Sequence, residues 1–183
     1  MKKAYLILAQ GFELIEAMTP LDVLKRVGVE VTTISIGNGT EVASSQGIEV
    51  KADTVFESGS FRDGDLLILP GGYPGYENIG NHKDVIELAA YYLNSNNKYL
   101  GAICGAPSAL AKARLIDGRR VTAHFTVKDL LIDSHYVDEK VVIDGNLITS
   151  TGAGRSLDFA LVLGEVLTDH QTMEKVKKGM TLI

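Results

Sequence analysis

The feature that most constrains the fold of this chain is the alternation of short apolar runs with longer amphipathic stretches. Each apolar run holds five to eight residues between turn residues, which is typical of strands in a sheet covered on both faces. Four such strands are expected: AYLILA at 4–9, VEVTTISI at 29–36, DLLILP at 65–70 and YLGAI at 99–103. The alternation predicts an α/β protein with a mainly parallel sheet between helical layers and right-handed crossovers.

The amphipathic stretches predict six helices. In the first, residues 13–28, apolar side chains recur at helical spacing and Gly28 suits the end of the helix. Pro20 either kinks this helix or opens its second part. The other expected helices are 83–96, 105–116, 126–133, 156–167 and 170–180.

Two segments break the alternation. Residues 40–53 and 139–151 each read as two short strands around a turn, Gln46-Gly47 in the first and Asp144-Gly145 in the second. We expect both hairpins at the edges of the main sheet. Because no linker, repeat or low-complexity stretch interrupts the chain, residues 1–183 are expected to form a single domain.

Composition narrows the classes of function. The net charge of -5 argues against a nucleic-acid or anionic-membrane surface. A single cysteine permits no internal disulfide, so a reducing compartment such as the cytoplasm is expected. No apolar run approaches the roughly 20 residues that span a bilayer, and the N-terminus does not resemble a signal peptide.

That cysteine, Cys104, stands where the strand at 99–103 gives way to a helix. The sequence AICGAP surrounds it with small residues that allow a sharp turn, and Pro107 suits an early helical position. The following helix directs its positive end towards the sulfur, so we expect a reactive thiol with a lowered pKa. The alternative is that Cys104 is a small buried hydrophobic residue.

A glycine pair, Gly71 and Gly72, follows the preceding strand in LILPGGYPG at 67–75. Amides without neighbouring side chains can approach a ligand closely. We expect the amides of Gly72 and Gly105 to form an oxyanion hole beside the sulfur, with Gly71 in the same substrate-binding turn. The alternative is a tight turn that requires positive φ.

Acid–base groups are expected at the same rim. Glu16 follows the first strand and is flanked by apolar residues, which favours burial and a raised pKa, whereas Glu13 reads as a charge at the helix start. His124 ends an apolar run and precedes a helix, so it also lies at the end of a strand. No histidine pair has metal-ligand spacing, and one cysteine cannot form a thiolate zinc cluster, so no metal is expected.

These motifs together resemble the ThiJ/PfpI superfamily, a class I glutamine amidotransferase-like group, and within it the branch of DJ-one and bacterial YajL. The resemblance covers nearly the whole chain through LILAQGFELIEAMTPLDVLKRVGVEVT, LLILPGG, AICGAPSALA, VTAHFTVKD and ITSTGAGRSLDFAL. It implies a flavodoxin-like three-layer α/β/α sandwich that forms a homodimer. It also implies roles for five residues: Cys104 as the oxidisable nucleophile, Glu16 as the protonated glutamate touching it, His124 as the pocket histidine, and Gly72 and Gly105 as the amides facing the sulfur.

The activity implied by the resemblance is the cofactor-free conversion of small reactive aldehydes, namely 2-oxoaldehydes such as methylglyoxal, to hydroxy acids. A disputed protein deglycase activity and a role in oxidative stress are also implied. The chain departs from the pattern at two positions, where Gln46 and Thr151 stand in place of arginines that help relatives hold anions near the thiol. Arg155 is a candidate to compensate for them.

Two other classes of function stay open at this point. A redox-sensing or chaperone-like stress protein would use oxidation of Cys104 rather than turnover. A PfpI-type peptidase usually has a histidine directly after the cysteine, where this chain has Gly105, and a glutaminase would need a His-x-Glu pair that the chain lacks. The sequence therefore favours the aldehyde-converting enzyme, with the redox protein as the main alternative.

Overall fold

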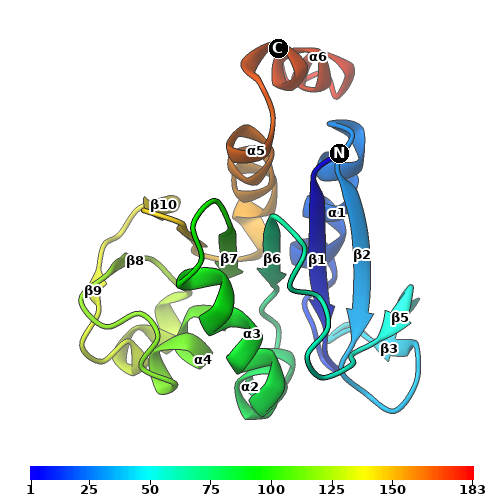
Figure 1. Ribbon diagram of the computed structural model, residues 1–183. Coiled ribbons are helices and arrows are strands. Elements are labelled where there is room, and N and C mark those ends of the chain that lie inside the picture. Colours follow the sequence, from blue (N-terminus) through cyan, green and yellow to red (C-terminus); the bar gives the residue numbers. More distant parts are fainter.

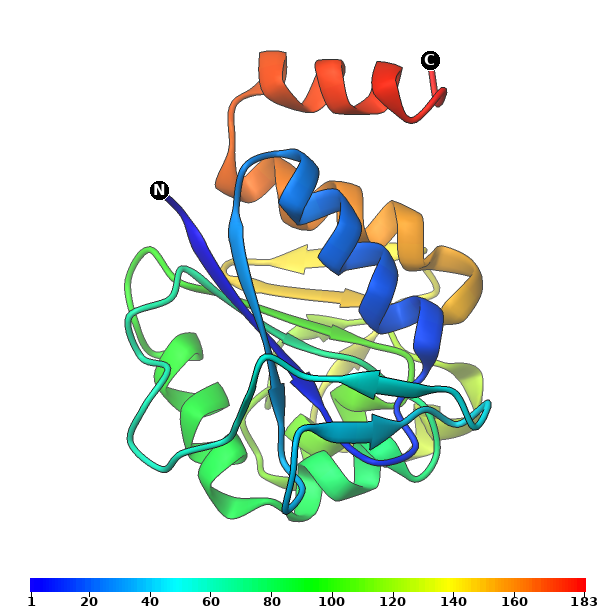
Figure 2. The same ribbon diagram turned by 90° about the vertical axis from the view of Figure 1, so that its right-hand side faces the viewer.

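The computed structural model describes residues 1–183 and has a seven-stranded sheet at its centre (Figures 1 and 2). In spatial order the strands are β10 (Val141–Asp144), β11 (Leu147–Ser150), β7 (Tyr99–Ile103), β6 (Leu66–Leu69), β1 (Lys3–Leu8), β2 (Glu30–Ser35) and β5 (Thr54–Val55). All neighbouring strands are parallel except β10, which runs antiparallel to β11. The mainly parallel α/β sheet predicted from the sequence is confirmed.

Helices cover both faces of this sheet. On one face lie α1 (Leu14–Arg26) and α5 (Ser156–Leu167), and α6 (His170–Gly179) packs outside them (Figure 2). On the other face lie α2 (Gly75–Asn81), α3 (Lys83–Leu93) and α4 (Ala106–Lys112), together with the 3-10 helix η1 (Phe125–Leu130) (Figure 1). A second 3-10 turn, η2 (Ala153–Arg155), precedes α5. None of the helices is long and apolar enough to cross a membrane.

Two hydrophobic cores hold the three layers together, and β1 contributes to both. Leu6 and Leu8 point into the core beneath α1 and α5, whereas Tyr5 and Ile7 point into the core beneath α3 and α4. Successive side chains of a strand face opposite sides of the sheet, so a strand buried on both faces reads as a continuous apolar run. This explains why the apolar runs marked the central strands.

The predicted hairpins are placed differently from the expectation. The hairpin at 40–53 forms its own two-stranded sheet from β3 (Glu41–Ala43) and β4 (Glu49–Lys51), separate from the main sheet. The segment 139–151 supplies the edge strand β10, but β11 lies inside the sheet and pairs in parallel with β7. Burial explains why β11 is the inner strand of the two, because every residue of β11 is buried while β10 keeps an exposed face.

Several elements differ from their predicted type or bounds. The helix expected at 126–133 is the 3-10 helix η1, and α1 continues through Pro20 without a break. Helix α2 was not predicted, because Gly75 and Gly80 obscure its pattern. Gly80 lets α2 and α4 approach closely, since a Cβ atom at this position would lie 3.0 Å from the Cβ of Ala109 on α4. The two-residue strands β5, β8 (Arg120–Val121) and β9 (His135–Tyr136) are too short to produce a periodic signal.

Candidate active site

The candidate site lies where three neighbouring parallel strands end. Strand β1 leads through a short loop into α1, β6 leads into Pro70-Gly71-Gly72, and β7 leads into Cys104. Because the carboxyl ends of parallel strands meet at one edge of a sheet, these loops converge there. This is the edge at which ligands bind in open α/β sheets.

Cys104 occupies a strained turn between β7 and α4. Its φ of 64° lies in the left-handed region, which non-glycine residues seldom adopt. Two backbone hydrogen bonds hold it: the Cys104 N–H donates to the Ser150 carbonyl at 2.9 Å, and the His124 N–H donates to the Cys104 carbonyl at 3.0 Å. The amides of Gly72 and Gly105 face the sulfur closely enough to favour its ionised form. The strand-to-helix elbow expected from the sequence is therefore present.

Three glycines allow this turn to pack against its neighbours. A Cβ atom on Gly71 would lie 2.6 Å from the Cβ of Cys104, and one on Gly105 would lie 2.4 Å from the ring of Tyr76. Gly72 has φ of 87°, and a Cβ there would lie 2.2 Å from the Glu13 nitrogen. No side chain can be accommodated at these positions without moving backbone or a packed ring.

Gly71 has a different role from the one expected. Its N–H donates to Oε2 of Glu16 at 2.8 Å, and its carbonyl accepts from the Glu13 N–H at 2.9 Å. The Gly71 amide is thus engaged by the carboxyl group and is not available to a substrate oxygen. Of the three glycines, Gly72 and Gly105 carry the amides that face the sulfur.

Glu16, in the first turn of α1, is fully buried behind Cys104. Its Oε2 accepts the Gly71 amide, while Oε1 is buried without a hydrogen-bond partner of ordinary geometry. The group that Glu16 interacts with on that side is the Cys104 thiol. That contact is looser than a good hydrogen bond, yet it couples the protonation of the two groups.

Burial controls the protonation of this pair. Loss of solvent raises the pKa of Glu16 to about 7, although the Gly71 amide and the thiol partly oppose the shift. Burial, together with the Glu16 charge, raises the pKa of Cys104 to about 12, against the opposing effect of the Gly72 and Gly105 amides. The expected lowering of the thiol pKa is therefore wrong, because desolvation outweighs the amides at the start of a short helix. Above pH 7 the pair carries one negative charge and one shared proton.

His124 lies on the other side of the sulfur and caps η1. Its Nδ1 is 2.8 Å from the Thr126 hydroxyl and also accepts from the Thr126 N–H at 3.4 Å. Nε2 makes no hydrogen bond within the protein. The ring is therefore fixed through one nitrogen and can use the other for proton transfer.

An open pocket of about 370 Å³ leads to Cys104. It is lined by Glu13, Gly72, Tyr73, Tyr76, Cys104, Gly105, His124, Thr126 and Val127. Among the residues predicted from the sequence, the structure brings the nucleophile, the histidine and the two amide donors to this pocket. Glu16 contacts the thiol from behind the pocket wall, so it acts at the sulfur or on groups bonded to it.

Sequence reasoning missed Gly152, which lies two residues after the end of β11. Its φ is 154°, and a Cβ atom there would lie 3.3 Å from His124 Cδ2, 3.7 Å from Cys104 Sγ and 3.8 Å from Glu16 Oε1. This glycine therefore keeps open the space between all three groups. A glycine close after a strand, in TSTGAG, is the signal that could have identified it. Tyr73 and Tyr76 were also missed, because aromatic residues in a loop resemble ordinary surface residues.

The positions that replace the family arginines lie apart from the sulfur. Gln46 donates to Glu13 Oε2 at 2.8 Å. Thr151 and Arg155 line a separate pocket that shares His124, and the Arg155 guanidinium lies 3.5 Å from Asp158. Arg155 therefore does not line the Cys104 pocket.

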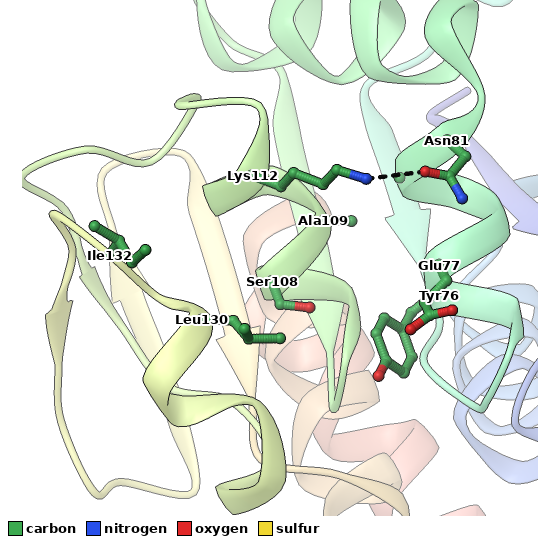
Figure 3. A pocket seen from close by; sticks show the side chains of 9 residues that line it. Tyr76, Glu77, Asn81, Ser108, Ala109, Lys112, Leu130 and Ile132 are labelled. Carbon is green, nitrogen blue, oxygen red and sulfur yellow. Dashed lines mark hydrogen bonds between the residues drawn. The ribbon is translucent and has the colours of Figure 1, made fainter.

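A second pocket, of about 430 Å³, lies beyond Tyr76, whose ring borders both (Figure 3). Figure 3 shows Tyr76 and Glu77 extending from α2 opposite Ser108 and Lys112 on α4. Lys112 donates to the Asn81 side chain at 3.0 Å across it. Nowhere in the chain do three or more His, Cys, Asp or Glu side chains gather in a way that could hold a metal ion.

Comparisons with known proteins agree with this architecture. The model of the DJ-1/PfpI family matches residues 2–166. Protein dj-1beta of Drosophila melanogaster is 35% identical over 98% of this chain and 96% of its own. Its crystal structure superimposes with a TM-score of 0.91 and covers 98% of this chain and 97% of that one. A Caenorhabditis elegans relative named glutathione-independent glyoxalase DJR-1.2 is 33% identical over 99% of this chain and 97% of its own. With matches along almost its whole length, this chain belongs to the DJ-1/PfpI family.

Proposed function

We propose that this chain is a cofactor-independent glyoxalase that converts 2-oxoaldehydes such as methylglyoxal to 2-hydroxy acids. The observation that carries the proposal is a single sulfur that two backbone amides face, that contacts a buried carboxyl group and that opens onto a pocket. These are the parts that nucleophilic attack on a carbonyl requires. The name of the nematode glyoxalase relative supports the choice of reaction.

The reaction begins with the monoanionic pair. When the shared proton resides on Glu16, Cys104 is a thiolate stabilised by the Gly72 and Gly105 amides. The thiolate attacks the aldehyde carbon of the substrate and forms an S–C bond. The carbonyl oxygen then takes a proton from Glu16, which gives a neutral hemithioacetal and leaves Glu16 as a carboxylate. The raised pKa of Glu16 suits this exchange near neutral pH.

Two proton transfers then rearrange the hemithioacetal. The Glu16 carboxylate removes the proton from the former aldehyde carbon while His124 protonates the ketone oxygen, which gives an enediol. Glu16 returns its proton to the second carbon, and His124 accepts the hydroxyl proton of the first. The product is a thioester of the 2-hydroxy acid, so one carbon is oxidised and its neighbour reduced without any external redox agent.

Water completes the cycle. It adds to the thioester carbon and gives one proton to the Glu16 carboxylate. The C–S bond then breaks, the Cys104 thiolate leaves as the 2-hydroxy acid forms, and the starting Glu16–Cys104 pair is restored. In the overall reaction, one 2-oxoaldehyde and one water molecule give one 2-hydroxy acid. All of these groups come from one chain. The homodimer, the deglycase activity and the cytoplasmic location implied by the resemblance stay predictions.

The direct test compares lactate formation from methylglyoxal by metal-free wild type, Cys104→Ser and Lys112→Gln. Wild type and Lys112→Gln are expected to form lactate at equal rates, since Lys112 lines only the neighbouring pocket. Cys104→Ser is expected to fall to background, because its hydroxyl is a far weaker nucleophile at neutral pH.

Lactate formation that survives in a folded Cys104→Ser protein would remove the cysteine from the mechanism. A wild type that forms no lactate, and in which mild peroxide converts Cys104 to a two-oxygen adduct by intact mass, would put the redox-sensing alternative in place of the enzyme.

A further inference from the structure

The Cys104 pocket is lined by one acidic residue, Glu13, and by no lysine or arginine. Glu13 caps the start of α1, and its N–H donates to the Gly71 carbonyl at 2.9 Å. This bond fixes the residue to the same glycine turn that supplies the Gly72 amide to the sulfur. The charge of Glu13 is therefore held at a defined place in the pocket wall.

The Glu13 carboxylate has only neutral partners. Its Oε2 accepts from the Ser45 hydroxyl at 3.1 Å and from the Gln46 amide at 2.8 Å. Its Oε1 makes no hydrogen bond within the protein, and Glu13 takes part in none of the ion pairs of the chain. Hydrogen bonds from neutral groups orient a carboxylate but leave its negative charge in place.

No lysine or arginine offsets that charge in the pocket, where His124 is the one basic side chain. Neither lysine nor arginine lines it, and Arg155, in the pocket beyond His124, lies against Asp158. The Glu16–Cys104 pair behind the sulfur adds a second negative charge near neutral pH. A concave surface with charges of one sign concentrates the electrostatic potential, which repels solutes of the same sign.

We infer that Glu13 is a specificity-determining residue that makes the pocket reject anionic reactants in favour of neutral or cationic ones. The substrate side of this inference rests on the proposed function: uncharged 2-oxoaldehydes such as methylglyoxal are accepted, and 2-oxoaldehydes that also carry a carboxylate, such as 4,5-dioxopentanoate, are excluded. The selection itself acts on any reagent that approaches Cys104, and it can be measured without turnover.

The test uses the alkylation of Cys104 by two reagents of similar size, neutral iodoacetamide and anionic iodoacetate. Both reagents react with the same fraction of thiolate at a given pH, so this fraction cancels in the ratio of their rate constants. Dividing that ratio by the same ratio for N-acetylcysteine removes the difference in intrinsic reactivity between the two reagents. Wild type is expected to prefer iodoacetamide, and Glu13→Gln is expected to lower this preference about three- to tenfold, the size of one partly screened charge.

A matched control removes the same charge outside the pocket. Glu77→Gln, on α2 beside the neighbouring pocket, is expected to leave the preference unchanged. Gln46→Lys places a cation beside Glu13 and is expected to lower the preference as Glu13→Gln does. Added salt is expected to weaken the preference of wild type, which tests the inference even if a variant does not fold.

Equal preferences in wild type and Glu13→Gln, or a wild-type preference insensitive to salt, would overturn the inference. If the proposed function holds, Glu13→Gln also raises kcat/KM for 4,5-dioxopentanoate, an anionic 2-oxoaldehyde, relative to methylglyoxal. A protein that lacks turnover but shows the alkylation preference would refute the proposed function and leave the selection by Glu13 intact.

Discussion

The two pockets on either side of Tyr76 differ in chemistry more than in size. The larger one, of about 430 Å³, is lined by α2, α4 and the exposed residues Leu130 and Ile132 (Figure 3). The smaller one, of about 370 Å³, contains Cys104 in a strained turn with a buried carboxyl group behind it. Strained backbone and a perturbed pKa gather at functional sites, whereas volume alone shows only that space exists.

The hydroxyl of Ser108 makes the contrast concrete. Ser108 lines the larger pocket and is only one helical turn beyond Cys104, yet its hydroxyl donates to the Gly105 carbonyl at 2.7 Å. A hydroxyl used in this way closes a turn and has no base to activate it. The nucleophile of the region is therefore the thiol, which has both a carboxyl group and two amides as partners.

The largest expected effect separates the carboxyl groups of the two pockets. Glu16→Gln is expected to lower methylglyoxal turnover about 10²–10⁴-fold, because glutamine keeps the shape and the Gly71 contact but cannot transfer a proton. Glu77→Gln, in the larger pocket, is expected to retain wild-type turnover. Steady-state rates of lactate formation, with circular dichroism to verify folding, measure both, and equal rates for the two variants would exclude Glu16 from the mechanism.

The pH dependence of alkylation sharpens this comparison. In wild type, the rate of Cys104 alkylation by iodoacetamide is expected to rise through about pH 7 to a plateau, since the Glu16–Cys104 pair loses its first proton there. In Glu16→Gln this step is absent and the rate rises only at higher pH with the thiol itself. A step near pH 7 that persists in the variant would show that the carboxyl group does not share its proton with the sulfur.

The second effect concerns stability. The pKa of Glu16 is about 7 in the folded chain against a reference of 4.5, so the folded state binds the proton more tightly than the unfolded state. Its contribution to stability is fully present below pH 4.5 and is lost as the pH rises through 7, a change of about 3 kcal/mol. Urea unfolding of wild type and Glu16→Gln across this range measures it as the difference between the two curves. A difference that stays constant with pH would mean that folding does not raise the pKa of Glu16.

Much of the fold could be predicted from the sequence because it depends on local patterns. Strand β7 and helix α5 have the predicted bounds, since one is an apolar run between turns and the other has a regular apolar face. The position of β11 inside the sheet could not be predicted. It depends on pairing with β7, almost fifty residues away, and the local sequence of a short strand does not indicate which strand it will pair with.

The candidate site also has features that could be predicted from the sequence and features that could not. Cys104, Glu16 and the glycines could be found because each follows a strand that ends at the same edge, and the geometry then brings them together. The direction of the thiol pKa could not be found, because it depends on how far burial by the surrounding layers outweighs the helix end. Gly152 was missed because its importance depends on the side chains that surround it in space, namely those of His124, Cys104 and Glu16.

The smallest expected effect concerns Tyr76, whose ring separates the two pockets. The Tyr76 ring packs directly on Gly105, where a Cβ atom would lie 2.4 Å from it, and it borders both pockets. Tyr76→Ala is expected to join the pockets and so favour a bulky 2-oxoaldehyde. The kcat/KM of phenylglyoxal relative to methylglyoxal should rise about tenfold, the scale of one added apolar contact region. Tyr76→Phe keeps the ring and should leave the ratio unchanged.

Access can be separated from catalysis in these variants. Alkylation of Cys104 by an N-benzyl iodoacetamide, relative to iodoacetamide itself, should rise in Tyr76→Ala and stay constant in Tyr76→Phe. If both reagents lose rate equally in the alanine variant, the ring supports the strained turn at Cys104 rather than dividing the pockets. If instead neither ratio moves, the larger pocket has no route to the sulfur even without the ring. The difference between the two pockets would then come from the turn between β7 and α4, and from its glycines, alone.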